Sequence, residues 1–262
     1  MRLEESCVLL MKLSSKEQLI VNFLEDKSIA TVDDICSFSE LSAATVRRYL
    51  IKLEEKGVIC RVHGGASLNR ELVSSPSIGE KISKNHKQKV LIAQKAVALI
   101  SDQDSIALDA GSTTLEIAKL LTQSVNVITP DLNIGLVLAR NQQIDVALTG
   151  GKVDFSAQSC IGQHSLAFIK KVHPLYAFIG CNGWSIESGI TTPTSDKASL
   201  KSALLNQSKI KVLVADSSKY NKSQLYEVCA LKDLDIIITD SDLPLEVREQ
   251  ITALGIELII CE

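Results

Sequence analysis

The sequence lacks any grouping of cysteine and histidine that would hold a metal ion. Its seven cysteines are scattered without one Cys-x-x-Cys pair, and none of its four histidines clusters with them. A zinc site needs four ligands at recognisable spacings, and the disulfide framework of a secreted domain uses an even number of cysteines. We therefore predict reduced, mostly buried thiols in a cytoplasmic protein, with no metal and no cofactor.

A membrane segment and a secretion signal are missing as well. No run reaches the roughly 18 consecutive apolar residues that a transmembrane helix needs. Glu4 and Glu5 stand ahead of a short apolar run, where a signal peptide would carry positive charge. We expect residues 1–12 to be a ragged leader, with Met11 as an alternative natural start to Met1.

An overall surplus of positive charge is also absent, because the formal net charge is -3. This excludes a generally basic nucleic-acid coat, so any DNA-binding surface has to be local. What the chain does have is 262 residues, 45% of them hydrophobic, which suffices for one small and one medium domain. We divide it into a first domain at residues 1–70, a polar linker at 71–88 and a second domain at 89–262.

The first domain is predicted to hold three helices and a short strand. A serine or threonine stands where each helix needs an N-cap: Ser14 or Ser15, then Thr31, then Ser42. The third helix carries Val46, Leu50 and Leu53 on one stripe that would face the core. Gly57 is expected to end this helix, and residues 58–62 to form the strand.

The third helix also gathers positive charge. Between Leu41 and His63, five basic residues are set against two acidic ones, which leaves a local surplus of three charges. Small residues at the start of the helix would let it enter the major groove, where arginines reach guanine edges or phosphates. The alternatives are a small helical domain whose arginines are only solvated, or a helix-turn-helix that binds another protein.

In the second domain, short apolar strands alternate with helical segments. The predicted strands are residues 105–110, 126–129, 145–148, 176–180, 211–215, 235–239 and 257–261. The predicted helices are residues 90–100, 114–121, 132–139, 199–205 and 245–254. This alternation predicts an α/β fold with a mainly parallel sheet covered by helices.

One strand end in this domain suits an anion. Asp109 follows an apolar strand, Gly111 provides a turn, and Ser112, Thr113 and Thr114 open a helix. Backbone N–H groups at a helix start attract anions, and open α/β sheets bind ligands at the carboxyl ends of their strands. A bound phosphate and a locally capped turn without a ligand are both open interpretations.

Polar residues at further strand ends, and one lysine in a following helix, extend this candidate site. They are Thr129, Asp131, Gly150, Gly151, Gly180, Asp216 and Lys219, with Lys201 on the helix. Turn chemistry alone does not explain so many polar strand ends, so we group them with the Asp109–Thr114 corner as one predicted effector site.

Both domains resemble the DeoR-type family of bacterial sugar-operon regulators. In the first domain the match runs through Thr45-Val46-Arg47-Arg48, Leu53-Glu54, Gly57 and Arg61-Val62-His63-Gly64-Gly65-Ala66. In the second domain it includes Leu108–Thr114, Thr129–Leu132, Thr149–Gly151, Phe178–Gly180, Gly189–Thr192, Lys201–Ala203 and Ala215–Tyr220. The resemblance covers nearly the whole chain from about Leu13.

The resemblance implies a winged helix-turn-helix joined to a sensor domain similar to ribose-5-phosphate isomerase. Such a protein is expected to be a homo-oligomer, dimer or tetramer, which represses a carbohydrate-utilisation operon until a phosphorylated sugar binds. Contacts to double-stranded DNA are expected from Ser42, Ala44, Thr45, Arg47, Arg48, Lys52, Arg61 and His63. The effector is expected at the strand ends given above, with its phosphate on the Gly111–Thr114 turn.

Several positions depart from the family pattern. Tyr49 stands where the family usually has Asp, Ser112 replaces Thr, Pro130 replaces Asn, Ser195–Lys197 replaces an acidic stretch, and Ser202 replaces Arg. We expect Tyr49 to alter packing or a phosphate contact without abolishing DNA binding, and the other changes to alter which sugar binds or how tightly. Two other functions stay open: a sugar-phosphate isomerase-like enzyme, and a regulator whose pocket no longer binds a ligand.

Overall fold

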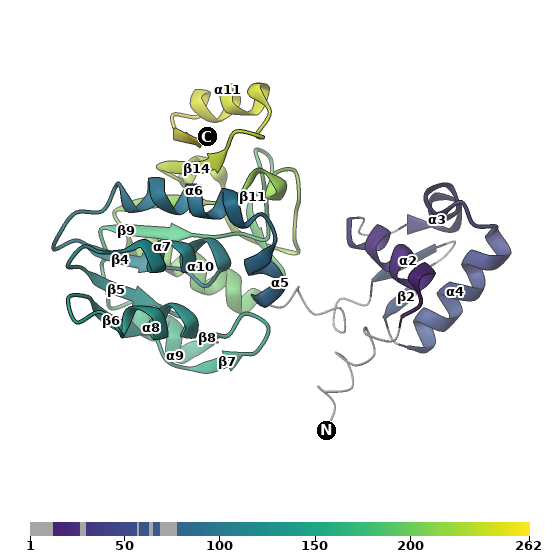
Figure 1. Cartoon of the computed structure of the whole chain (residues 1–262), viewed down its shortest axis with the longest axis horizontal. Coiled ribbons are helices and arrows are strands. Elements are labelled where there is room, and N and C mark those ends of the chain that lie inside the picture. Colours follow the sequence, from purple (N-terminus) through teal and green to yellow (C-terminus); the bar gives the residue numbers. More distant parts are fainter. Residues whose placement is uncertain (1–12, 27–29, 57, 63–64, 69–77) are drawn as a thin grey trace. The chain divides into compact units, whose positions relative to one another are not determined.

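The computed structural model describes residues 13–26, 30–56, 58–62, 65–68 and 78–262. The chain divides into two compact units, residues 1–75 and 76–262 (Figure 1). The expected leader at residues 1–12, Gly57 and His63 lie outside the described residues. Among the described helices, none combines the length and the apolar character that crossing a membrane requires.

The first unit consists of three helices and a small antiparallel sheet. Its elements are α2 (Ser15–Asp26), β1 (Ala30–Thr31), α3 (Val32–Ser39), α4 (Ala43–Glu55), β2 (Ile59–Val62) and β3 (Gly65–Leu68). The strands lie in the order β1-β3-β2. Glycine is required at position 65, because a Cβ there would lie 2.1 Å from the Ala30 carbonyl oxygen of the neighbouring strand. The three predicted helices are thereby confirmed, together with a strand ribbon after them.

Each of the three helices begins at a predicted cap. At the start of α2, the Ser14 hydroxyl accepts from the Glu17 N–H (3.3 Å) and the Glu17 carboxylate accepts from the Ser14 N–H (2.7 Å). Thr31 forms the same reciprocal capping box at α3. At α4, the Ser42 hydroxyl accepts from the Thr45 N–H at 3.3 Å. The last cap fixes where the arginine-bearing helix starts.

The core of the first unit is apolar and buries the predicted stripe of α4. Its buried members are Ile20, Val21, Leu24, Ala30, Ile35, Val46, Leu50, Leu53, Val58, Ile59 and Ala66. Because Val46, Leu50 and Leu53 all point into this core, the opposite face of α4 is left to solvent.

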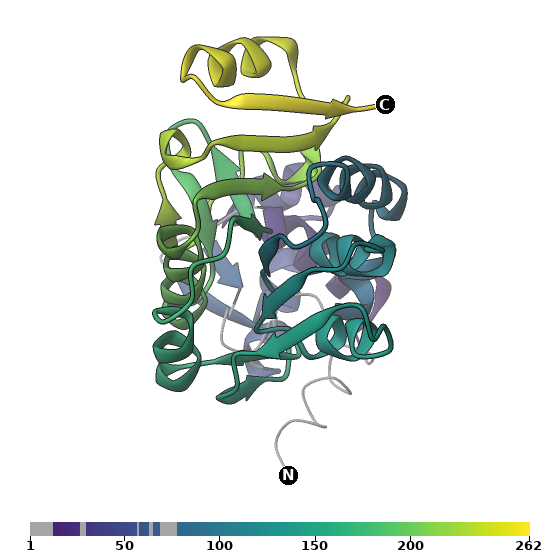
Figure 2. The same ribbon diagram turned by 90° about the vertical axis from the view of Figure 1, so that its left-hand side faces the viewer.

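Seven parallel strands form the centre of the second unit (Figure 2). In chain order they are β4 (Ser105–Leu108), β5 (Asn126–Thr129), β6 (Asp145–Leu148), β9 (Tyr176–Ile179), β12 (Ile210–Val214), β14 (Ile236–Asp240) and β15 (Glu257–Cys261). All seven predicted strands are confirmed, with ends that agree within two residues. The order across the sheet is β15-β14-β12-β9-β4-β5-β6. The order therefore reverses between β4 and β9, and such a reversal leaves a crevice at the carboxyl ends of the strands.

Helices cover both faces of this sheet (Figure 2). One face carries α6 (His86–Val97), α7 (Ser112–Leu120) and α8 (Leu132–Leu138), and the other carries α9 (Gln163–Ile169), α10 (Ser195–Gln207) and α11 (Leu245–Ala253). Side chains alternate along the strands, so that Ile106 and Leu108 enter the first core and Ala107 enters the second. This three-layer arrangement confirms the predicted α/β class.

Short strands that the sequence does not predict flank the sheet. β7 (Lys152–Asp154) and β8 (Ser159–Ile161) form a hairpin, and β10 (Gly183–Ser185), β11 (Gly189–Thr192) and β13 (Tyr226–Cys229) form a separate antiparallel sheet. The 3-10 turns η1 (Ser217–Lys219) and η2 (Leu231–Asp233) accompany them. Strands of three or four residues are too short for alternation or an apolar run to mark them.

The interval predicted as a linker, residues 71–88, contains helices, which corrects the prediction. α5 (Ile78–Ser83) and the first residues of α6 fall inside it, and both belong to the second unit. The start of α6 is rich in lysine and glutamine, so it lacks the apolar period that marks a helix in sequence. The correction matters because α5 contributes to the site described below.

We expect Leu50→Ala to destabilise the first unit by about 2–5 kcal/mol, because it leaves a cavity in a closed core. The adjacent and exposed Ile51 supplies the matched control, since Ile51→Ala is expected to change stability by less than about 0.5 kcal/mol. Urea unfolding of the full chain is followed by circular dichroism. Fluorescence of Trp184, the sole tryptophan, reports the second unit and is expected to be unaffected. Equal effects of the two substitutions would contradict the core assignment.

Candidate functional site

The solvent face of α4 carries the residues predicted to meet DNA. The exposed members of the predicted set are Ser42, Ala44, Arg47, Arg48, Lys52 and, on β2, Arg61. Thr45 is half-buried, with its hydroxyl 2.9 Å from the Ser42 hydroxyl. No carboxylate among the described side chains pairs with Arg47 or Arg48, so both guanidinium groups are available to an external anion.

Tyr49 packs beside Arg48 and links it to the core. The Arg48 guanidinium carbon lies 5.9 Å from the centre of the Tyr49 ring, while the tyrosine packs partly buried against the first unit's core. A guanidinium over an aromatic face is attracted by the ring quadrupole. Tyrosine at this position therefore supports Arg48 on the outer face of the helix without covering it.

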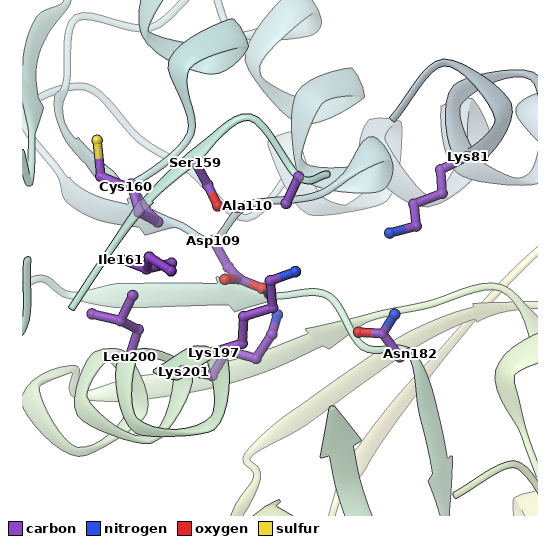
Figure 3. A pocket seen from close by; sticks show the side chains of 12 residues that line it. Lys81, Asp109, Ala110, Ser159, Cys160, Ile161, Asn182, Lys197, Leu200 and Lys201 are labelled. Atoms are coloured by element: carbon purple, nitrogen blue, oxygen red, sulfur yellow. Dashed lines mark hydrogen bonds and ion pairs between the residues drawn. The ribbon is translucent and has the colours of Figure 1, made fainter. Parts of the chain in front are cut away.

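A pocket opens in the second unit where the strand order reverses (Figure 3). Its lining comes from α5, from the chain after β4, β5 and β9, from the β7–β8 hairpin and from α10. The lining residues are Lys81, Asp109, Ala110, Pro130, Ala157, Ser159, Cys160, Ile161, Asn182, Lys197, Leu200 and Lys201. Three of them are lysines and one is an aspartate.

Asp109 and Lys201, both predicted site residues, form a buried ion pair at the base of this pocket. The Lys201 ammonium also donates to the Gly180 carbonyl (2.8 Å), and the Asp109 carboxylate accepts from the Gly180 N–H (3.1 Å). These bonds join the ends of β4 and β9 to α10. The pair is internally satisfied, so a ligand meets it as a nearly neutral surface.

Two further lysines line the pocket, and neither was predicted as a site residue. Lys197, one turn before Lys201 on α10, pairs with Asp154 of the hairpin at 2.7 Å. Burial would raise the pKa of Asp154, but Lys197 beside it lowers that pKa to about 2. Lys81 of α5 pairs with no carboxylate among the described side chains. Burial, followed by the charges of Lys197, Lys219 and Lys201, lowers the pKa of Lys81 to about 8.

Asp131 caps α8 and directly follows Pro130 of the lining. Its Oδ1 accepts from the N–H groups of Asn133 (2.8 Å) and Ile134 (3.1 Å). Its Oδ2 is buried without a hydrogen-bond partner in the described part of the chain. Burial raises the pKa of Asp131 to about 6, although the two N–H groups oppose this. A buried oxygen without a partner suits a ligand hydroxyl.

The Gly111 corner lies beside the lining, which it reaches through Ala110. The Thr114 hydroxyl donates to the carbonyls of Asp109 (2.7 Å) and Gly111 (2.9 Å). For this residue, the interpretation as a locally capped turn therefore applies. Ser112 and Thr113 are buried at the start of α7, which has no side-chain cap. The N–H groups at this helix start are therefore not occupied by a capping side chain.

Three predicted residues near β5 and β6 make internal contacts outside the lining. The Thr129 hydroxyl accepts from the Asp131 N–H at 3.1 Å. The Gly150 carbonyl accepts from the Ser165 hydroxyl. A Cβ at position 151 would lie 2.7 Å from the same hydroxyl oxygen, so glycine is needed there for a close approach.

The last two predicted residues, Asp216 and Lys219, lie at the end of β12. Asp216 is buried and accepts from the Asn85 side-chain amide at 2.8 Å. Lys219 is half-buried on η1 and close enough to Lys81 to lower its pKa. Neither belongs to the lining, and Lys219 acts on Lys81 through its charge.

The lysines that the prediction missed had weak signals. Lys81 falls in the interval taken for a linker, and Lys197 falls in the Ser195–Lys197 departure from the family's acidic stretch. The lysine in that stretch, where the family usually carries acidic residues, was the available clue. No grouping of three or more His, Cys, Asp or Glu suited to a metal occurs among the described residues.

Comparison with known proteins gives matches for both units. A model of the DeoR-like helix-turn-helix domain matches residues 16–71, and one of the DeoR C terminal sensor domain matches residues 84–241. An uncharacterized HTH-type transcriptional regulator from Haemophilus influenzae is 34% identical over 94% of this chain and 97% of its own length. The HTH-type transcriptional repressor GlcR from Bacillus subtilis is 31% identical over 93% of this chain and 94% of its own.

Solved structures give more distant matches. A probable sor operon regulator from Shigella flexneri is 13% identical with a TM-score of 0.43, covering 61% of this chain and 88% of its own. Ribose 5 phosphate isomerase A from Neisseria gonorrhoeae is 20% identical with a TM-score of 0.38, covering 52% of this chain and 54% of its own.

We expect the stability that Asp131 contributes to fall as pH rises. Its pKa of about 6 in the folded chain lies above the ordinary 3.8, so the folded state holds this proton more tightly. The contribution is full below about pH 4 and is lost as pH rises through 6, by about 3 kcal/mol in total. The measurement is urea unfolding by Trp184 fluorescence for the wild type and Asp131→Asn. If the difference in unfolding free energy between the two proteins does not change from pH 4 to 7, the raised pKa of the buried Asp131 carboxyl group is contradicted.

Proposed function

Because the chain belongs to the DeoR family of transcriptional regulators, we propose that it represses a carbohydrate-utilisation operon and is released by a phosphorylated sugar. The observation that carries the effector half is the convergence of Lys81, Lys197 and Lys201 on one pocket at the switch point of a parallel sheet. The charge of Lys81, which has no carboxylate partner among the described side chains, favours a phosphate over a neutral sugar in a partly enclosed crevice.

The first unit reads the operator. α4 enters the major groove, with Arg47 and Arg48 on base edges or phosphates and Lys52 and Arg61 on the flanking backbone. The exposure of these side chains supports the assignment. Two or more subunits place such helices on successive turns of a repeated or palindromic site, so the regulator acts as a dimer or tetramer. It carries out this role in the cytoplasm.

The second unit binds the effector. Lys81 and Lys197 hold the phosphate, aided by N–H groups at the start of α7. The unpartnered Oδ2 of Asp131 and the Asn182 side chain accept or donate hydrogen bonds to sugar hydroxyls. Pro130, in place of an asparagine amide, leaves fewer polar groups to select the sugar.

An enzymatic role has less support. Lys201 and Asp109, the groups best placed for acid-base work, are bonded to each other and to Gly180. Both are therefore engaged in holding the fold, and neither is poised to exchange a proton with a ligand.

Arg47→Ala and Arg48→Ala are each expected to weaken DNA binding about 5- to 150-fold, the range of a lost base or phosphate contact. The probe is a duplex selected by the full chain from a random library, and affinity is measured at several salt concentrations. Each lost phosphate contact is expected to lower the salt slope by about one. Lys232→Ala, at an exposed site in the second unit, is the matched charge control. Unaltered affinity of the arginine variants at moderate salt would sink the recognition-helix assignment.

A sugar monophosphate is expected to raise the melting temperature of the second unit and to weaken the DNA complex. The panel comprises glucose 6-phosphate, fructose 1-phosphate, fructose 6-phosphate and ribose 5-phosphate, with the free sugars and inorganic phosphate as controls. Tenfold weaker binding, about 1.4 kcal/mol, is expected for Lys197→Met, and no change for Lys232→Met. Appearance of product would favour the enzyme instead. No melting shift with DNA binding intact would favour a regulator that binds no sugar phosphate.

A further inference from the structure

α5 is the first helix of the second unit and lies at the chain's entry to it. β3 ends at Leu68 and α5 begins at Ile78, so nine residues of chain connect the last strand of the first unit to this helix. Lys81 on α5 lines the pocket, and its ammonium points toward the other lysines (Figure 3). One of the charges that a ligand meets is thus carried by the helix that follows the connection between the units.

The carboxyl end of α5 is anchored to the body of the second unit. The buried Lys89 of α6 donates to the carbonyl oxygens of Lys81 and Lys84. Between the two helices, the Asn85 amide donates to the Asp216 carboxylate (2.8 Å) and to the Ser218 hydroxyl (3.0 Å). Carbonyl groups at a helix end have no partner within the helix, so these bonds determine where α5 ends. Its other end, Ile78, is the end that the chain joins to the first unit.

Lys81 differs from the other two pocket lysines in its partners. Lys197 and Lys201 both lie on α10 and are held by Asp154 and Asp109. Lys81 pairs with no carboxylate among the described side chains, and it shares the pocket with two like charges. A phosphate would turn repulsion at Lys81 into attraction, while the lysines of α10 would exchange one anionic partner for another. Occupancy of the pocket therefore changes the force on α5 more than the force on α10.

We propose that Lys81 couples the pocket to the DNA-binding unit. A bound phosphate attracts the Lys81 ammonium and so changes the force on α5. Because α5 is anchored at its carboxyl end, this change is passed through its amino end along the chain to the first unit. This inference rests on the proposed sugar-phosphate site. A ligand shifts an equilibrium only through contacts that differ between the two states. Lys197 then supplies affinity, whereas Lys81 supplies affinity and the change in DNA binding.

The test separates binding from coupling in the full chain. DNA affinity is measured by fluorescence anisotropy on the selected duplex, without sugar and at saturation with the panel monophosphate that gives the largest melting shift, at constant ionic strength. The wild type is expected to change its DNA affinity about 5- to 150-fold. Lys197→Met should need about ten times more sugar but show the full change at saturation. Lys81→Met should still bind the sugar, yet change its DNA affinity less than about twofold.

Lys84→Met removes the same charge three residues further along, at an exposed site, and is expected to respond like the wild type. The melting shift of each variant with sugar establishes that it is folded and saturated. A full response from saturated Lys81→Met overturns the coupling role. Complete loss of sugar binding in that variant overturns it too, because Lys81 would then be a binding residue only. If the wild type responds to no panel sugar in melting or in DNA affinity, the proposed function fails and this inference with it.

Discussion

Asp109 and Lys201 are separated by 92 positions in the chain, and their buried ion pair joins the ends of β4 and β9 to α10. Removing one partner of such a pair leaves an uncompensated charge in a low-dielectric interior, at a cost of about 3–5 kcal/mol. The Gly180 N–H and carbonyl complete the arrangement, so neither charge is left to a ligand alone. The crevice at the strand reversal is therefore held at its base by a pair that needs no ligand to satisfy it.

In the first unit, one helix contributes to the core and also carries the residues proposed to contact DNA. Val46, Leu50 and Leu53 hold α4 in the core, and the cap at Ser42 fixes its first turn. With that side of the helix committed, Arg47 and Arg48 project to solvent in a fixed register. The Tyr49 ring beside Arg48 limits the freedom of a long side chain, which would lower the entropy lost in the proposed contact with a phosphate.

Much of the fold follows from local signals in the sequence. Ser14, Thr31 and Ser42 mark helix starts, and apolar composition marks the seven strands. Both signals can be read from the sequence because a cap or a buried strand is determined by residues next to one another in the chain. The pocket, in contrast, is formed by residues that lie far apart in the sequence. Asp109 and Lys201 were predictable from strand ends and a family motif, but Lys81 lies on a polar helix whose place is set by Lys89 and Asn85. Lys197 is paired with Asp154, which lies on a hairpin whose strands are too short to recognise in the sequence.

The balance of charge among the described residues of the pocket supports the proposed phosphate ligand. Asp109 compensates Lys201 and Asp154 compensates Lys197, so Lys81 carries the charge that has no acidic partner among the described residues. A neutral sugar would leave this buried ammonium without a counter-charge. In the proposed complex a single phosphate would neutralise it and compete with Asp154 for Lys197, while a second phosphate would meet the Asp109 carboxylate in the lining. Because the unmatched charge lies on α5, the side chain proposed to bind a phosphorylated ligand lies on the first helix of the second unit.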